Sequence, residues 1–118
     1  METVGFIGLG VMGRPMAKHI LAKGYQVIVF NRSRPAVDEL VGAGALAGTS
    51  PADVAARATV VITMVPDTPD VEAVVSGPAG ILESLTPGSV VIDMSSISPV
   101  ATKALAASVA AKGSTMLD

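Results

Sequence analysis

The sequence contains no cysteine and no tryptophan, and only one tyrosine and two phenylalanines among its 118 residues. The missing cysteine excludes disulfides, zinc–thiolate centres, iron–sulfur clusters and thiol nucleophiles. So few aromatic rings argue against a base-stacking platform for single-stranded nucleic acid. Charge is also sparse: eight basic and ten acidic residues leave a net charge of −2. This balance argues against a dedicated nucleic-acid or anionic-membrane surface.

Long apolar runs are missing too, although half of the residues are hydrophobic and the mean hydropathy is +0.61. A membrane span needs about 20 consecutive apolar residues. The longest charge-free stretch, residues 40–52, is interrupted by three glycines and Pro51. Glu2 stands where a signal peptide carries basic residues, and Arg14 breaks the apolar run that follows. We therefore expect a cytoplasmic protein with strands buried on both faces and with apolar surface that meets another domain or subunit.

Short apolar runs rich in β-branched residues alternate with helix-like segments. Strands are predicted at residues 4–7, 26–30, 59–64 and 89–93, with weaker ones at 45–47 and 116–117. Helices are predicted at residues 11–23, 35–41, 51–57, 66–76 and 99–112. This alternation predicts one α/β domain over residues 1–118, a doubly wound, mainly parallel Rossmann-type sheet with helices on both faces.

The first predicted strand runs directly into a glycine-rich segment formed by Gly8, Leu9, Gly10, Val11, Met12 and Gly13. The G-x-G-x-x-G spacing alone is a weak signal, because chance would supply it in roughly one in ten chains with this glycine content. Its place between a strand and a helix, however, is that of a dinucleotide-binding loop. Gly8 would permit the tight turn, Gly10 the approach of a pyrophosphate to the helix N-terminus, and Gly13 close packing of helix on strand. The alternative is a glycine-rich turn without a ligand.

The end of the second predicted strand carries Asn31, Arg32, Ser33 and Arg34. A site selective for NAD usually has an acid there, about 20 residues after the glycines. An acid would repel the 2′-phosphate of NADP, whereas Arg32 and Ser33 would bind it. We therefore predict that Asn31, Arg32 and Ser33 belong to an NADP site, with NAD as the weaker ligand. The alternative is that Ser33 only caps a helix and that the arginines are solvated.

Two more segments follow strands at the same predicted edge of the sheet, where α/β sheets place ligands. The third strand is followed by Met64, Val65 and Pro66, and the fourth leads into the hydroxyls of Ser95 and Ser96. These residues are candidates for the cofactor site.

The remaining polar residues predict neither a metal site nor an acid–base pair. His19 is the only histidine and lies in a helical segment, where a surface or half-buried residue is expected rather than a metal ligand. Asp67, Asp70 and Glu72 are expected to favour a helix N-terminus through their negative charge.

Residues 5–17, GFIGLGVMGRPMA, resemble the opening signature of the β-hydroxyacid dehydrogenases. That family includes 3-hydroxyisobutyrate dehydrogenase, tartronate semialdehyde reductase and 6-phosphogluconate dehydrogenase. Met64, Val65 and Pro66 resemble its M-[LV]-P loop beside the cofactor, and residues 93–99, DMSSISP, resemble its D-[MS]-S-[ST]-x-x-P segment. The resemblance covers the whole chain. It implies that Ser96 contacts the nicotinamide end of the cofactor and that Ser95 lies next to the substrate.

The family's substrate motif, D-A-P-V-S-G-G, is represented here only by its first letter, Asp118. The family's catalytic lysine belongs to a later, all-helical domain, and no lysine of this chain lies in a matching context. We therefore expect no catalytic residue and no metal ligand within residues 1–118. We expect this domain to bind NADP(H) without turnover, to self-associate, and to take a small hydroxy acid only if the helical domain is supplied.

The resemblance implies an oxidoreductase that transfers hydride between the nicotinamide and a small β-hydroxy acid or semialdehyde, such as 3-hydroxyisobutyrate or tartronate semialdehyde. The alternative is a non-catalytic dinucleotide-binding module, used as a sensor or an assembly domain. The residues encoded after Asp118 would separate these two hypotheses.

Overall fold

The computed structural model describes residues 2–95 and 97–117. Its strands are β1 (Thr3–Ile7), β2 (Gln26–Phe30), β3 (Leu46–Ala47), β4 (Val60–Thr63), β5 (Val90–Asp93) and β6 (Thr115–Leu117). Its helices are α1 (Gly13–Ala22), α2 (Arg34–Gly42), α3 (Pro51–Arg57), α4 (Thr68–Ser76) and α5 (Pro99–Ala111), with a short 3-10 helix, η1 (Ile81–Glu83). All predicted elements are present, and η1 is an addition that the sequence did not predict. None of the described helices is both long enough and apolar enough to cross a membrane.

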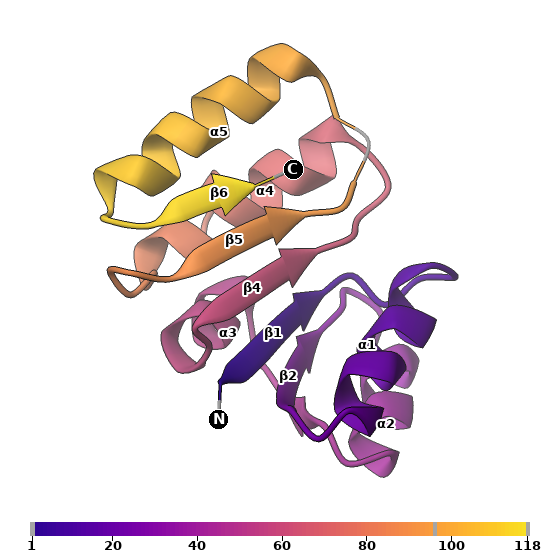
Figure 1. The fold of residues 1–118 in the computed structure, drawn as a ribbon. Coiled ribbons are helices and arrows are strands. Elements are labelled where there is room, and N and C mark those ends of the chain that lie inside the picture. The colour runs from indigo at the N-terminus through magenta and orange to yellow at the C-terminus, as the bar shows by residue number, and fades with distance from the viewer. Residues whose placement is uncertain (1, 96, 118) are drawn as a thin grey trace.

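The strands form one sheet in the order β3-β2-β1-β4-β5-β6, and every neighbouring pair is parallel. Figure 1 shows all visible arrows pointing the same way. The chain winds outward from β1 in one direction and from β4 in the other, so the strand order reverses between these two strands. This is the doubly wound Rossmann topology, and it confirms the predicted fold class.

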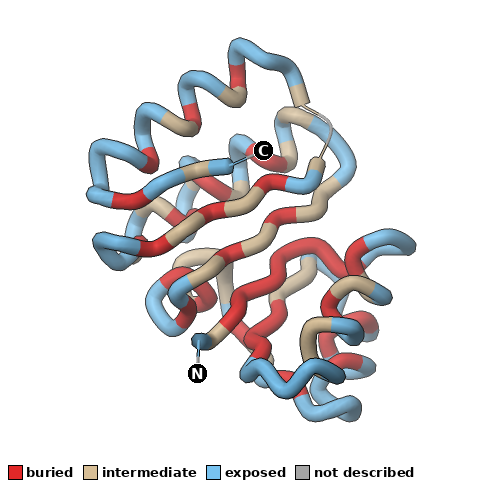
Figure 2. Tube along the Cα trace, in the orientation of Figure 1, coloured by how far each residue is buried: buried red, intermediate tan, exposed pale blue. Residues whose placement is uncertain are grey.

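Helices cover the two faces of the sheet unequally. One core cluster lies between the sheet and the helices α1 and α2, and includes Phe6 and Leu40. The other lies beneath α3, α4 and α5, and includes Ile7 and Val75. β1 and β2 contribute to both clusters and form the most continuously buried part of the sheet (Figure 2).

The prediction that all main strands are buried on both faces is wrong for β4 and β5. Their residues alternate between buried and partly exposed, because α1 and α2, the helices on that side of the sheet, pack mainly on β1, β2 and β3. We name this surface the open face; it is formed by Val60, Ile62, Val90, Ile92 and Leu117, of which Ile62 also packs against the edge of the α1–α2 cluster. Ile62, Ile92 and Leu117 lie side by side across three strands.

Three helices begin with a side-chain cap hydrogen bond, whereas α2, which begins beside the candidate site, does not. Ser50 accepts a hydrogen bond from the backbone of Asp53 at the start of α3, Asp67 caps α4, and Ser98 caps α5. Ser33 occupies the capping position of α2 but makes no side-chain cap bond. Its hydroxyl is therefore not used to start the helix, contrary to the alternative weighed above.

Helix α1 packs against the sheet mainly through small residues. Met12 precedes the helix and is exposed, as is Lys23, whereas Gly13 and Ala17 are buried against the sheet. Small residues bring the helix axis close to β1, so larger neighbours such as Met16 pack only at the edge of the core.

Glu39 on α2 joins this helix to α1. Its carboxylate lies 2.5 Å from Lys18 Nζ and 3.2 Å from Arg14 Nη1. The hydrogen bond from Lys18, and then the positive charges of Lys18 and Arg14, hold the pKa of Glu39 below its usual value. A lowered folded-state pKa stabilises the fold above the ordinary pKa of the group, and this stabilisation is lost as the pH falls through the lowered value.

Candidate cofactor site

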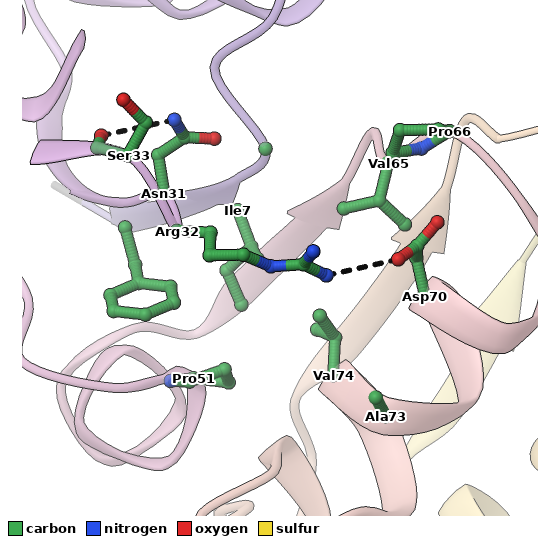
Figure 3. Close-up of a pocket in the computed structure, with 12 residues that line it drawn as sticks. Ile7, Asn31, Arg32, Ser33, Pro51, Val65, Pro66, Asp70, Ala73 and Val74 are labelled. Carbon is green, nitrogen blue, oxygen red and sulfur yellow. Dashed lines mark hydrogen bonds and ion pairs between the residues drawn. The ribbon is translucent and has the colours of Figure 1, made fainter.

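Two adjoining pockets lie at the carboxyl ends of β1, β2, β4 and β5, where the strand order reverses. The first has a volume of about 500 Å³ and contains Arg32 and Asp70 (Figure 3). The second has a volume of about 390 Å³ and contains Gly10 and Ser95. Lining residues common to both are Gly8, Asn31, Val65 and Pro66. The pockets therefore form one elongated groove at the position where open α/β sheets bind ligands.

Two glycines of the loop are required by the protein itself. Gly8 has a φ of 102°, and an added Cβ would lie 2.1 Å from the backbone oxygen of Met64. The Gly8 N–H donates to the Phe30 carbonyl at 3.0 Å, which fixes the turn to the end of β2. An added Cβ at Gly13 would lie 2.0 Å from the Gly8 carbonyl oxygen. These contacts agree with the predicted turn and the close packing of α1.

Gly10 has a different environment. An added Cβ there would meet no protein atom within 4 Å, and its φ lies outside the left-handed region. The fold therefore gives no steric reason for glycine at this position, although the residue lines the second pocket. The adjoining N-terminus of α1 has no side-chain cap and no acidic residue in its first turn. An uncapped helix start beside open space is suited to a phosphate group.

Asn31 holds the glycine loop in place. Its Oδ1 accepts from the Leu9 N–H at 2.8 Å, and its Nδ2 donates to the Ser33 carbonyl at 3.1 Å. The sequence indicated that Asn31 replaces an acid at the ribose position. The structure adds that this amide bridges the loop after β1 and the segment after β2.

Arg32 and Asp70 face each other across the first pocket. The Arg32 guanidinium donates from Nη2 to Asp70 Oδ1 at 3.0 Å, as the dashed line in Figure 3 marks. The Arg32 side chain is 87% exposed and that of Asp70 is 27% exposed. Asp70 lies in the first turn of α4, where its negative charge was expected to favour the helix N-terminus. The sequence did not predict that Asp70 also pairs with Arg32. The two residues are separated by 38 positions, and no local pattern in the sequence links them.

Ser95 joins the loops that follow β4 and β5. Its Oγ accepts from the Val65 N–H at 2.9 Å, and its own N–H donates to Asp93 Oδ1 at 3.1 Å. Asp93 is buried, and the same oxygen accepts from the Thr63 hydroxyl at 2.9 Å. Met64 and Val65 are thereby brought beside Ser95 in the second pocket. The predicted nicotinamide contact, Ser96, lies outside the described residues.

The described lining of the groove can bind and orient a ligand but offers little acid–base chemistry. In the first pocket, Arg32 and Asp70 are the only ionisable side chains among the described lining residues, and the second pocket has none. Within residues 2–95 and 97–117, no group of three or more potential metal ligands comes together. Backbone N–H groups, the Arg32 guanidinium and the hydroxyls of Ser33 and Ser95 are hydrogen-bond donors suited to an elongated, phosphate-bearing ligand, and the Asp70 carboxylate is the one acidic group beside them among the described lining residues.

Comparison with known proteins agrees with this interpretation. Residues 3–118 match the family model described as the NAD binding domain of 6-phosphogluconate dehydrogenase. The chain is 43% identical over 118 residues to 3-sulfolactaldehyde reductase from Escherichia coli, with all of this chain and 40% of that protein covered. It is 43% identical over 115 residues to human mitochondrial 3-hydroxyisobutyrate dehydrogenase, with 98% of this chain and 34% of that protein covered.

Two further similarities concern the cofactor. The chain is 41% identical over 118 residues to an NAD-dependent L-serine dehydrogenase from Pseudomonas aeruginosa, with all of this chain and 40% of that protein covered. A solved structure described as Psf3 in complex with NADP+ and 2-OPP superposes with a TM-score of 0.89 at 33% identity, covering 96% of this chain and 40% of the other. One of these similar proteins is therefore named as NAD-dependent, and the other is described in complex with NADP+.

Fold, groove and glycine loop together define a dinucleotide-binding domain of Rossmann type. The chain belongs to the family of NAD binding domains of 6-phosphogluconate dehydrogenase and its relatives, the β-hydroxyacid dehydrogenases. The predicted family resemblance is thus confirmed, and the family consists of oxidoreductases that act on hydroxyl groups. The chain spans 34 to 40% of the length of these curated relatives.

Proposed function

We propose that residues 1–118 bind NADP(H) along the groove, with the adenosine end in the first pocket and the nicotinamide end in the second. The environment of Gly10 is the observation that carries this proposal. The residue lies beside open space and the uncapped start of α1, and the packing of the protein does not require glycine there. Arg32 and Ser33 would hold the 2′-phosphate, and the N-terminus of α1 would hold the pyrophosphate. Met64, Val65 and Ser95 would line the nicotinamide end.

The cofactor would supply hydride exchange at its nicotinamide ring, and this domain would supply binding and orientation. Asn31 would keep the glycine loop in its binding conformation through the bond to Leu9. The bonds of Ser95 to Val65 and Asp93 would fix the walls around the ring. The relatives are named for a hydroxy acid, a hydroxy amino acid and a sulfonated aldehyde. We propose a small β-hydroxy acid or semialdehyde as the substrate of the complete enzyme, with Ser95 next to it.

NADPH is expected to bind about ten- to a few hundred-fold more tightly than NADH. Arg32 and the unused Ser33 hydroxyl offer two bonds to a phosphate, and a charge-assisted hydrogen bond contributes about 1.5–3 kcal/mol, reduced here by solvent exposure. Arg32→Ala should weaken NADPH binding by about tenfold or more and change NADH binding less. Parallel titrations of both cofactors at one salt concentration measure the effect.

Lys112→Ala is the matched control. Lys112 follows the last residue of α5, whereas the first residues of this helix lie near the site (Figure 1), so the variant removes one positive charge without changing the groove. This variant should keep the wild-type preference for NADPH. Equal affinities for the two cofactors in the wild-type protein would contradict the proposed NADP selectivity.

We also propose that the 118-residue chain self-associates through the open face. This face aligns apolar side chains of β4, β5 and β6, and Leu117 at its edge is 51% exposed. Burying such a surface against a second copy removes it from water. Sedimentation velocity at micromolar concentration should show a dimer or larger species, and Ile92→Glu should shift it to monomer.

Val100→Glu provides the comparison for this experiment. Val100 is 80% exposed on α5 and does not belong to the open face, so its replacement should leave association unchanged. A monomeric wild-type chain would reject the proposal.

A further inference from the structure

The ion pair between Arg32 and Asp70 places a negative charge at the adenosine end of the groove. Arg32 follows β2, and Asp70 belongs to α4, so the pair spans the point where the strand order reverses (Figure 3). The Arg32 side chain remains 87% exposed and bonds Asp70 through a single nitrogen, Nη2. Its guanidinium therefore retains donors that a phosphate could use.

The charges of this pocket nearly cancel while the ion pair is closed. Arg32 and Asp70 are the only ionisable side chains among the described lining residues, one positive and one negative. A phosphate monoester at neutral pH carries between one and two further negative charges, whereas the corresponding hydroxyl of NAD carries none. The Asp70 carboxylate therefore acts on the two cofactors differently.

We propose that Asp70 is a specificity-determining residue that lowers the preference of this site for NADP over NAD. It competes with the 2′-phosphate for Arg32, and it repels the phosphate once Arg32 has turned toward it. NAD binding requires neither the release of Arg32 nor the approach of a second negative charge. This inference rests on the proposed cofactor function. In many dinucleotide sites an acid at the end of β2 discriminates between NAD and NADP, and here an acid on α4 would take over part of that role.

Asp70→Asn tests the inference in the whole chain. The substitution keeps the size of the side chain and removes its charge, and the start of α4 stays capped because Asp67 makes the cap bond. An ion pair this exposed is weak, so we expect a change of about three- to tenfold in favour of NADPH and less than about twofold for NADH. The gain should shrink as salt is raised.

Three variants complete the design. Glu72→Gln removes an exposed acid from the same helix and should leave the ratio of affinities unchanged. Asp70→Glu preserves the charge and should keep a ratio close to wild type. In the double variant Arg32→Ala/Asp70→Asn, most of the gain seen with Asp70→Asn alone should be lost, because competition for Arg32 no longer exists.

The outcomes separate this inference from the proposed function. Wild-type protein without a preference for NADPH, unaffected by Arg32→Ala, would contradict the NADP function itself. A clear preference that Arg32→Ala abolishes but that Asp70→Asn leaves unchanged or reduces would overturn the role of Asp70 and leave the function standing. Equal weakening of both cofactors by Asp70→Asn in a chain with unchanged thermal unfolding would also overturn it, since Asp70 would then act only by supporting the pocket.

Discussion

Gly10→Ala is expected to weaken cofactor binding by roughly ten- to a hundredfold while the midpoint of thermal unfolding stays within about 2 °C of wild type. The new methyl group would contact no protein atom, and the backbone at Gly10 suits any residue, so the free protein tolerates it. The same methyl group would project beside the uncapped start of α1, where the pyrophosphate is proposed to approach. Overpacking of this kind costs about 1–3 kcal/mol.

Gly8→Ala provides the opposite case within the same loop. An alanine there would adopt a left-handed φ of 102° and place its Cβ 2.1 Å from the Met64 backbone oxygen. Backbone strain and overpacking together should lower the free energy of unfolding by about 3–5 kcal/mol, and the midpoint by more than about 10 °C. Calorimetry or circular dichroism measures stability, and titration with NADPH measures binding.

The pair of variants distinguishes a glycine kept for a ligand from one kept for the fold. If Gly10→Ala binds NADPH as tightly as the wild-type protein, the pyrophosphate does not approach this residue and the loop is only a turn. If Gly8→Ala unfolds at the wild-type temperature, the packing of the loop against the end of β4 is looser than the structure indicates.

Local patterns in the sequence were sufficient to predict the strands and the doubly wound fold class. Runs such as residues 26–30 and 89–93 are β-branched and apolar, and each is followed by glycine, proline or serine signals that start the next helix. Their alternation leaves few arrangements open, because parallel strands joined through helices form right-handed units. The register of the strands was not predicted; in the structure Ile7 of β1 lies between Phe30 of β2 and Thr63 of β4.

Features that depend on distant parts of the chain were not predictable in this way. The partial exposure of Ile62 and Ile92 depends on which face of the sheet the helices cover, and an apolar strand has the same sequence in either case. The bond from Leu9 to Asn31 joins residues 22 positions apart, and the Arg32–Asp70 pair is more distant still. An acid in a first helical turn is well explained by the helix dipole alone, so its second role leaves no separate signal.

The polypeptide of residues 1–118 is expected to show almost no dehydrogenase activity while it binds cofactor. No titratable group is found among the described residues of the second pocket, where the nicotinamide is proposed to lie. General acid–base catalysis contributes about 10²–10⁴ in rate, and substrate positioning contributes more. With saturating NADP and 3-hydroxyisobutyrate, we expect turnover below about 10⁻³ s⁻¹, against about 10 s⁻¹ for an ordinary enzyme.

A steady-state absorbance assay at 340 nm measures the turnover, and a cofactor titration of the same sample shows that the protein still binds the dinucleotide. Human 3-hydroxyisobutyrate dehydrogenase, which is 43% identical over 115 residues, serves as the reference, and both proteins are assayed with NADP and with NAD. A rate within tenfold of that reference would show that an acid or base among residues 1–118 reaches the substrate.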